Sequence, residues 1–116
     1  ANLFYEWKDE GDKNKAKHEI HLLGEVITSL GGITKFIVND EGDKELSFVL
    51  ITTEANNQMK SIHSRMPLII ENDALDYWLD NNTSKNIIKE IMESNINHQL
   101  KIERNSDEPF EQMKLF

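Results

Sequence analysis

The chain has 116 residues, so it is one domain or part of one, able to bury a small hydrophobic core. Its 21 acidic and 13 basic side chains give a net charge of -8, so the average field repels phosphate and contact with nucleic acid requires a local basic patch. No cysteine is present, which excludes a disulfide framework, a thiolate zinc site and a cysteine nucleophile within these residues.

The hydropathy and the start of the chain bear on its location. No apolar stretch approaches the about 18 residues of a membrane-spanning helix, and the amino end lacks a signal-peptide pattern. We therefore expect a cytoplasmic protein with no membrane partner. The first residue is Ala1 and strand-like sequence begins almost at once, which suggests the later part of a larger domain.

The first elements in chain order are predicted to form a hairpin. Aromatic residues predict a strand at 3–8. Alternation along it places Phe4, Glu6 and Lys8 on one face, and Leu3, Tyr5 and Trp7 on the other. The glycine and dense charge of 9–17 predict a solvated hairpin loop, after which 18–23 resumes an extended pattern.

More strands are predicted in the middle of the chain. β-Branched residues indicate strands at 26–30 and 33–38, and the paired glycines at 31–32 indicate a bulge or a close backbone approach. A turn signal at 39–43, whose glycine can take a positive φ, precedes a strand at 46–53. We expect that last strand to be buried.

The chain then turns helical for short stretches. Asn56 is placed to cap a helical turn over 57–62, and a polar loop ends at Pro67, which disfavours helix in the residue before it. The apolar segment 68–70 predicts a second buried strand.

Two amphipathic helices and a returning strand complete the prediction. The first helix spans 74–79 with a cap at Asn72 or Asp73, and the second follows a cap at Thr83 or Ser84. Alternation then continues to residue 102, and a polar stretch follows. These patterns predict an α+β fold, predominantly β, with two or three short helices. A single partial domain covers 1–116, with its core at 1–104 and a loosely held tail at 105–116.

Glu6 is the first candidate for chemistry. It lies between Tyr5 and Trp7, and aromatic neighbours would partly desolvate its carboxylate and suit it to proton transfer. An ordinary solvent-facing glutamate in a strand is the alternative.

His63 and Arg65 are the other candidates, on the polar loop between the two strands expected to be buried. Such a loop on a rigid base is where binding and catalytic groups tend to lie. A structural histidine and an arginine paired with a nearby acid are the alternatives. His18 and His21 have a spacing that could face a metal, but no other ligands are nearby, and we expect no metal or cofactor.

Four short blocks match one known family in the same order. They are Ala1-Asn-Leu-Phe-Tyr-Glu-Trp7, Thr52-Thr-Glu-Ala-Asn56, Ile62-His-Ser-Arg-Met-Pro67 followed by Leu68-Ile-Ile70, and Trp78-Leu79. On these blocks the chain resembles the SOS response-associated peptidase family, SRAP. Its members carry Ala-Asp-Gly-Phe-Tyr-Glu-Trp, Thr-Thr-Glu-Ala-Asn and Ile-His-x-Arg-Met-Pro before an apolar run and a Trp-Leu pair.

The resemblance implies a fold, a partner and site residues. It implies an SRAP-like mixed sheet or open barrel, truncated at the amino end, that binds single-stranded DNA and forms a covalent crosslink at abasic sites through an amino-terminal cysteine. Carried over, Glu6 serves in proton transfer and Schiff-base chemistry. His63 assists opening of the sugar aldehyde and stabilises the linkage or its reversal. Thr52 and Arg65 are the candidates for contacting the DNA backbone.

The chain also departs from the family pattern. It begins inside that pattern, without the cysteine nucleophile, and Asn2 and Leu3 stand where the family has Asp and Gly. Whether the chain is an enzyme therefore stays open, and we expect it to be inactive alone. The alternative is a non-enzymatic remnant that acts as an acidic protein-interaction module or self-associates. A homodimer through a sheet edge beside Phe4 and Trp7 is one form this would take.

Overall fold

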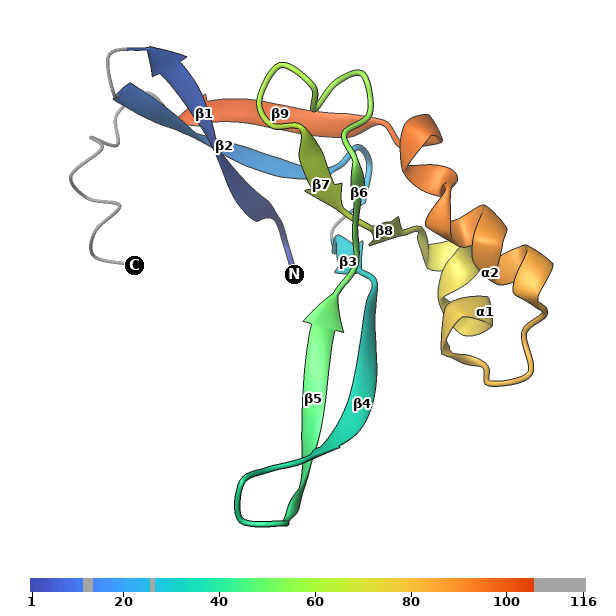
Figure 1. Ribbon diagram of the computed structural model, residues 1–116. Helices are drawn as coiled ribbons and strands as arrows, with labels where there is room; N and C mark the ends of the chain where they lie inside the picture. Colours follow the sequence, from blue (N-terminus) through green and yellow to red (C-terminus); the bar gives the residue numbers. More distant parts are fainter. Residues whose placement is uncertain (12–13, 26, 106–116) are drawn as a thin grey trace.

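The structure, a computed structural model, describes residues 1–11, 14–25 and 27–105. Its strands are β1 (Phe4–Gly11), β2 (Asn14–Leu22), β3 (Ser29–Leu30), β4 (Gly32–Val38), β5 (Lys44–Leu50), β6 (Thr52–Glu54), β7 (Arg65–Pro67), β8 (Ile69–Ile70) and β9 (Leu100–Asn105). Its helices are the short 3-10 turns η1 (Asn72–Ala74) and η2 (Ser94–Asn97) and the α-helices α1 (Leu75–Leu79) and α2 (Lys85–Met92). The predicted α+β fold, predominantly β, is confirmed, and its sheets are open (Figure 1).

A three-stranded antiparallel sheet in the order β1-β2-β9 covers one side of the core. Phe4 pairs with Ile20, and Ile20 pairs with Ile102, so one row of apolar side chains crosses the whole sheet. Ile20 is fully buried, and the other two pack against the same core. Because side chains alternate along a strand, Glu6 lies on this core face, two residues beyond Phe4.

The charged segment at 9–17, which the sequence predicted as a loop, lies mostly in strands. β1 runs to Gly11 and β2 begins at Asn14. The prediction was wrong because strands pair through backbone groups, and charged side chains can stay in water while they do so. A bidentate contact also holds this end of the sheet, where Arg104 donates to both carboxylate oxygens of Glu10 at 2.7 and 3.1 Å.

Three connections between successive strands meet at one place, where Gly31, Ile51 and Leu68 bond to one another. The Gly31 amide donates to the Leu68 carbonyl at 2.7 Å, the Ile51 amide to the Gly31 carbonyl at 3.0 Å, and the Leu68 amide to the Ile51 carbonyl at 2.8 Å. A Cβ on Gly31 would lie 2.9 Å from the Leu68 side chain, so the expected close backbone approach is confirmed. On one side of this joint lies the core, and on the other the β4–β5 hairpin extends alone (Figure 1).

The hairpin turn forms as predicted, but the hairpin is not buried. The Asn39 side-chain oxygen accepts from the amides of Glu41 and Asp43, and Gly42 has φ of 83°. The expectation of a buried strand at 46–53 was wrong, because Leu46 and Phe48 are 62% and 63% exposed. The apolar composition correctly predicted a strand. No other segment of the described chain covers β5, however, so its side chains stay exposed.

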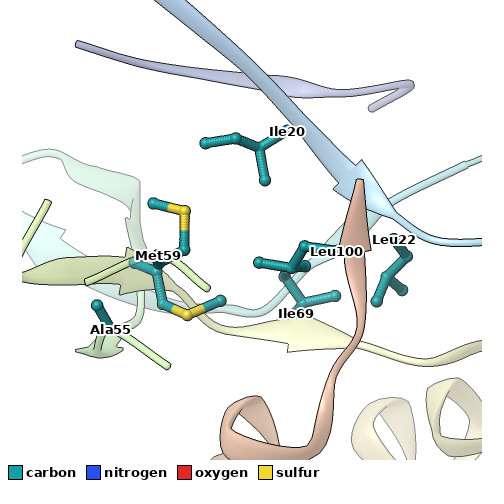
Figure 2. Close-up of a cluster of buried hydrophobic side chains, with 7 residues drawn as sticks. Ile20, Leu22, Ala55, Met59, Ile69 and Leu100 are labelled. Atoms are coloured by element: carbon teal, nitrogen blue, oxygen red, sulfur yellow. The ribbon is translucent and has the colours of Figure 1, made fainter. Parts of the chain in front are cut away.

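Two apolar clusters make up the core. The larger joins the β1-β2-β9 sheet to β7, β8 and the segment after β6, and Figure 2 shows it; its buried members are Ile20, Leu22, Ala55, Met59, Met66, Ile69 and Leu100. The smaller lies toward the helices, with Leu68, Ile70 and Ile91 buried. Successive residues of 68–70 point alternately into the two clusters, so this segment is buried as predicted.

The two predicted amphipathic helices are present as α1 and α2, but not all of their predicted capping residues act as caps. The Ser84 side chain accepts from the Ile87 amide and caps α2, as one of the two predicted caps. Neither η1 nor α1 has a side-chain cap, and the Asn72 side-chain nitrogen instead donates to the Glu25 carboxylate at 2.6 Å. The returning strand is β9. Its last residue is Asn105, so the rest of the predicted tail, 106–116, lies outside the described residues.

Candidate functional site

Glu6 is held on the core face of β1, directly opposite His18 of β2. The rings of Tyr5 and Trp7 lie on the other face, where the Lys17 ammonium is 4.0 Å from the centre of the Tyr5 ring. The expected desolvation of Glu6 by these two rings is therefore wrong. Its side chain is 26% exposed, at the margin of the core.

His63 is fixed at the end of a compact turn that begins at Asn56. The Asn56 side-chain oxygen accepts from the Met59 amide, as a capping residue does, and the His63 amide donates to the Met59 carbonyl. Met59 is fully buried in the larger cluster. The turn is thus anchored by one buried side chain, while the His63 imidazole at its end stays 45% exposed.

The fold brings Glu6 and His63 together from positions 57 residues apart in the chain. The His63 Nε2 atom lies 4.0 Å from the Glu6 Oε1 atom. That separation is longer than a direct hydrogen bond, and a single ligand oxygen about 2.8 Å from each atom fits between them. The closeness that the family resemblance implies is therefore present.

The backbone of Arg65 orients the imidazole. The Arg65 amide donates to His63 Nδ1 at 3.2 Å, and the Arg65 carbonyl lies 3.3 Å from the same nitrogen. When Nδ1 accepts from the amide, the ring hydrogen is on Nε2 and points toward the Glu6 carboxylate. A carboxylate that accepts and an imidazole that donates can act together on one ligand oxygen.

Thr52 and Arg65, the candidates for DNA contact, touch each other across β6 and β7. Arg65 Nη2 donates to the Thr52 carbonyl at 2.9 Å and to the Thr52 hydroxyl at 3.2 Å. Both residues are exposed, so the other guanidinium N–H groups of Arg65 can reach a phosphate. Arg65 follows His63 by two residues, so one segment carries both candidates.

A buried polar network that was not predicted from the sequence supports the site. Asn95 is 2% exposed, and its side chain accepts from the Ile69 amide at 3.0 Å. The same side chain donates to the Thr53 hydroxyl at 2.6 Å and to the Pro67 carbonyl at 3.0 Å. It therefore joins β6 to β7, the two strands that carry Thr52 and Arg65.

Asn56 and His98 extend this network under the turn that carries His63. The Asn56 side-chain nitrogen donates to the carbonyls of Asn95 and His98, at 2.9 and 3.2 Å. The two ring nitrogens of His98 lie 3.0 Å from Glu71 and 2.8 Å from the Ile69 carbonyl. Asn56, Asn95 and His98 lie in polar stretches that are typical of solvated turns, so their burial was not predictable from the sequence.

Within the described ranges, no group of three or more His, Asp or Glu side chains is placed to hold a metal ion. His18 and His21 lie on opposite faces of β2, so they do not converge as their spacing suggested. None of the described helices is long and apolar enough to cross a membrane.

Comparison with known proteins adds a family to this geometry. The model of the family described as SOS response associated peptidase (SRAP) matches residues 1–108. The abasic site processing protein YoaM of Bacillus subtilis is 33% identical over 93 residues, which cover 79% of this chain and 41% of YoaM. YedK of Escherichia coli, which has the same descriptive name, is 30% identical over 81% of this chain and 41% of its own length. The chain thus spans less than half the length of these relatives.

Solved structures agree with the fold. A protein from Bacteroides thetaiotaomicron matches 90% of this chain and 47% of its own chain, with a TM-score of 0.73 and 28% identity. A protein from Bordetella bronchiseptica matches with a TM-score of 0.65 at 15% identity, which bears on the fold alone.

Proposed function

Because the chain belongs to the SOS response associated peptidase (SRAP) family, we propose that it is the acid–base part of a domain that processes abasic sites in DNA. Glu6 and His63 move the protons of the reaction, and Thr52 and Arg65 contact the DNA backbone. The observation that carries the proposal is the 4.0 Å approach of the carboxylate and the imidazole, with the exposed Arg65 two residues along the chain from His63. Family relatives that bear the name abasic site processing protein support the choice of substrate.

The chemistry of an abasic site needs such a pair. An amine that attacks the aldehyde carbon of the opened sugar gives a carbinolamine, and loss of water from it gives a Schiff base. One proton must leave the amine and one must reach the departing hydroxyl. Glu6 is assigned to these transfers. His63 protonates the sugar-ring oxygen as the ring opens, and afterwards stabilises the linkage or assists its reversal.

The rest of the machinery comes from outside these residues. The sequence has no cysteine, so the nucleophile that the family resemblance implies is supplied by another segment. The net charge of -8 also means that most phosphate contacts must come from that segment, since each contact contributes to salt-dependent binding. Single-stranded DNA is the proposed form of the substrate, because its bases and sugars are accessible without unpairing. The cytoplasm is the proposed compartment.

A chimera tests the roles of the two residues. This chain replaces the matched 93 residues of YoaM, and crosslinking to abasic single-stranded DNA is followed by denaturing electrophoresis. Glu6→Gln and His63→Ala should each slow crosslink formation or reversal by about a hundredfold, the usual contribution of a positioned acid or base.

Matched controls come from the same chain. Glu41→Gln removes an exposed carboxylate in the hairpin turn, and His21→Ala removes an imidazole on the far face of β2. Both controls should retain the crosslinking rate of the parent chimera. If Glu6→Gln and His63→Ala behave like these controls, the assignment of the acid–base pair is wrong.

A second candidate function is self-association without catalysis. The observation that favours it is that β1 lies at the edge of the β1-β2-β9 sheet, with Tyr5 50% exposed beside it. An unpaired strand edge can bind another copy in an antiparallel dimer. Light scattering over a wide concentration range tests this candidate, and a monomer at every concentration would exclude it.

A further inference from the structure

The β4–β5 hairpin has two faces of different chemistry. Phe36 pairs with Leu46 and Thr34 pairs with Phe48, so these four side chains share one face. The whole face, which we call the Phe face, carries Thr34, Phe36, Val38, Leu46, Phe48 and Leu50, with Lys44 at its tip. The opposite face, which we call the mixed face, carries Ile33, Lys35, Ile37, Glu45, Ser47 and Val49. Apolar side chains concentrate on the first face.

The Phe face is open to solvent in the described chain. Phe36 is 67% exposed, Phe48 63% and Val38 68%. Monomeric proteins rarely leave such a continuous apolar row uncovered, and a hairpin of two strands is only marginally stable in water by itself. The row therefore has the character of a surface that another polypeptide covers.

The relatives indicate which polypeptide it is. The Bacteroides protein matches 90% of this chain with only 47% of its own length. The unmatched tenth of this chain is shorter than the hairpin, so at least part of the hairpin belongs to the shared fold. The other half of that longer protein has no counterpart here, and an uncovered face of the shared half is where it would pack.

Charge favours this occupant over a second copy. The hairpin tip carries Asp40, Glu41 and Asp43, and the whole chain has a net charge of -8. Two copies joined at this hairpin would bring like charges together, whereas a segment with basic residues around an apolar centre would be attracted.

We propose that the Phe face is the docking surface for the part of an SRAP domain that lies outside the region matched here. The occupant is an apolar, strand-forming segment with a basic rim. This inference goes beyond the proposed function, because it concerns assembly and needs no catalytic role for Glu6 or His63. Docking would also act on the site, since the hairpin base is bonded through Gly31 and Ile51 to Leu68, next to β7.

Binding of the two parts tests the docking surface. The full chain is mixed with the part of YoaM that lies outside the matched segment, labelled with a fluorophore, and affinity is measured by fluorescence anisotropy. Phe36→Ser with Phe48→Ser should weaken binding by about tenfold or more, as loss of buried aromatic anchors does. Ile33→Ser with Val49→Ser is the matched control, because both side chains are 56% exposed on the mixed face, and it should change affinity by less than about threefold.

Two further measurements separate the possible outcomes. Hydrogen exchange of the unmodified chain should slow in 32–50 when the YoaM segment is added, and Glu6→Gln should bind the segment as the parent does. Equal weakening by the two double variants would overturn the proposal. So would no binding, or a concentration-dependent dimer of the chain alone that Phe36→Ser with Phe48→Ser abolishes, because the occupant would then be a second copy.

Discussion

The same kind of apolar strand is buried on one side of the joint at Gly31 and exposed on the other. Ile69 and Ile70 of β8 are 0% and 2% exposed, whereas Val49 and Leu50 of β5 are 56% and 43% exposed. The first pair lies between two clusters, and the second lies on a hairpin that projects from the core (Figure 1). Apolar sequence therefore predicts a strand, while the partner surface decides whether that strand is buried.

The candidate site belongs entirely to the packed region. Glu6, His63 and Arg65 are carried by β1, by the turn that Met59 anchors and by β7, all in contact with the larger cluster. The packed region can thus hold the geometry of the site, while the hairpin offers the surface on which a second part can dock. Stability measurements can separate the two regions.

The largest difference is expected between single truncations in the two regions. Ile20→Ala should lower the free energy of unfolding by about 3 kcal/mol, because it leaves a cavity at the centre of the larger cluster. Phe36→Ala, on the exposed hairpin, should change it by no more than about 0.5 kcal/mol. Urea unfolding followed by circular dichroism measures both. Equal losses would show that the hairpin is packed in solution.

The second-largest loss of stability is expected when the buried side-chain amide of Asn95 is removed. Asn95→Ala leaves the Ile69 amide and the Pro67 carbonyl without their partner in a buried place, which should cost about 2 kcal/mol. Asn97→Ala, two residues along and exposed, is the control and should be near neutral. Chemical denaturation compares the two, and a near-neutral Asn95→Ala would mean that water replaces the amide.

The joint between the regions should respond to a single added methyl group. In Gly31→Ala the new Cβ would lie 2.9 Å from the side chain of Leu68, which is fully buried and has little room to move. Overpacking of this kind should cost about 1 to 2 kcal/mol. Ser29→Ala on the neighbouring strand β3 is the control. A substitution at Gly24 cannot serve, because the positive φ of Gly24 would add backbone strain of its own. A neutral Gly31→Ala would contradict the close approach.

The smallest effect is a pH-dependent one at the far end of the sheet. The hydrogen bonds from Arg104 lower the pKa of the Glu10 carboxyl below its usual value of 4.5, even though partial desolvation acts in the opposite direction. Stability from this pair is therefore fully present above pH 4.5 and is lost as the pH falls through the lower, folded-state pKa. Because the pair is exposed, Glu10→Gln should lower Tm by about two degrees or less at pH 7. The difference should shrink as the pH falls below 4.5, and a difference that stays constant with pH would contradict this contribution.

The sequence predicted the order and type of most elements, because strand alternation, turn glycines and helix caps are local signals. Ser84, Gly42 and Asn56 behave as those signals require. Local patterns also made Glu6 and His63 candidates, but only the motif resemblance implied that the two lie close together. Exposure of the hairpin was missed because burial depends on what lies opposite a strand.

Contacts between distant residues were beyond local reasoning. Asn95 and His98 become core residues only because η2 folds back against β7 and β8, which no window of sequence contains. The Glu10–Arg104 pair joins residues 94 positions apart, and its partners look like ordinary charged positions on separate strands.

One measurement tests the central claim most directly: that this chain holds the acid–base pair and depends on another segment for the nucleophile. The isolated chain and the YoaM chimera are each incubated with abasic single-stranded DNA, without a reductant, and resolved by denaturing electrophoresis. We expect no stable crosslink from the isolated chain, since a lysine alone can form only a transient Schiff base. The chimera should form a stable crosslink. A robust crosslink from the isolated chain would contradict the central claim and require a lysine or terminal-amine mechanism.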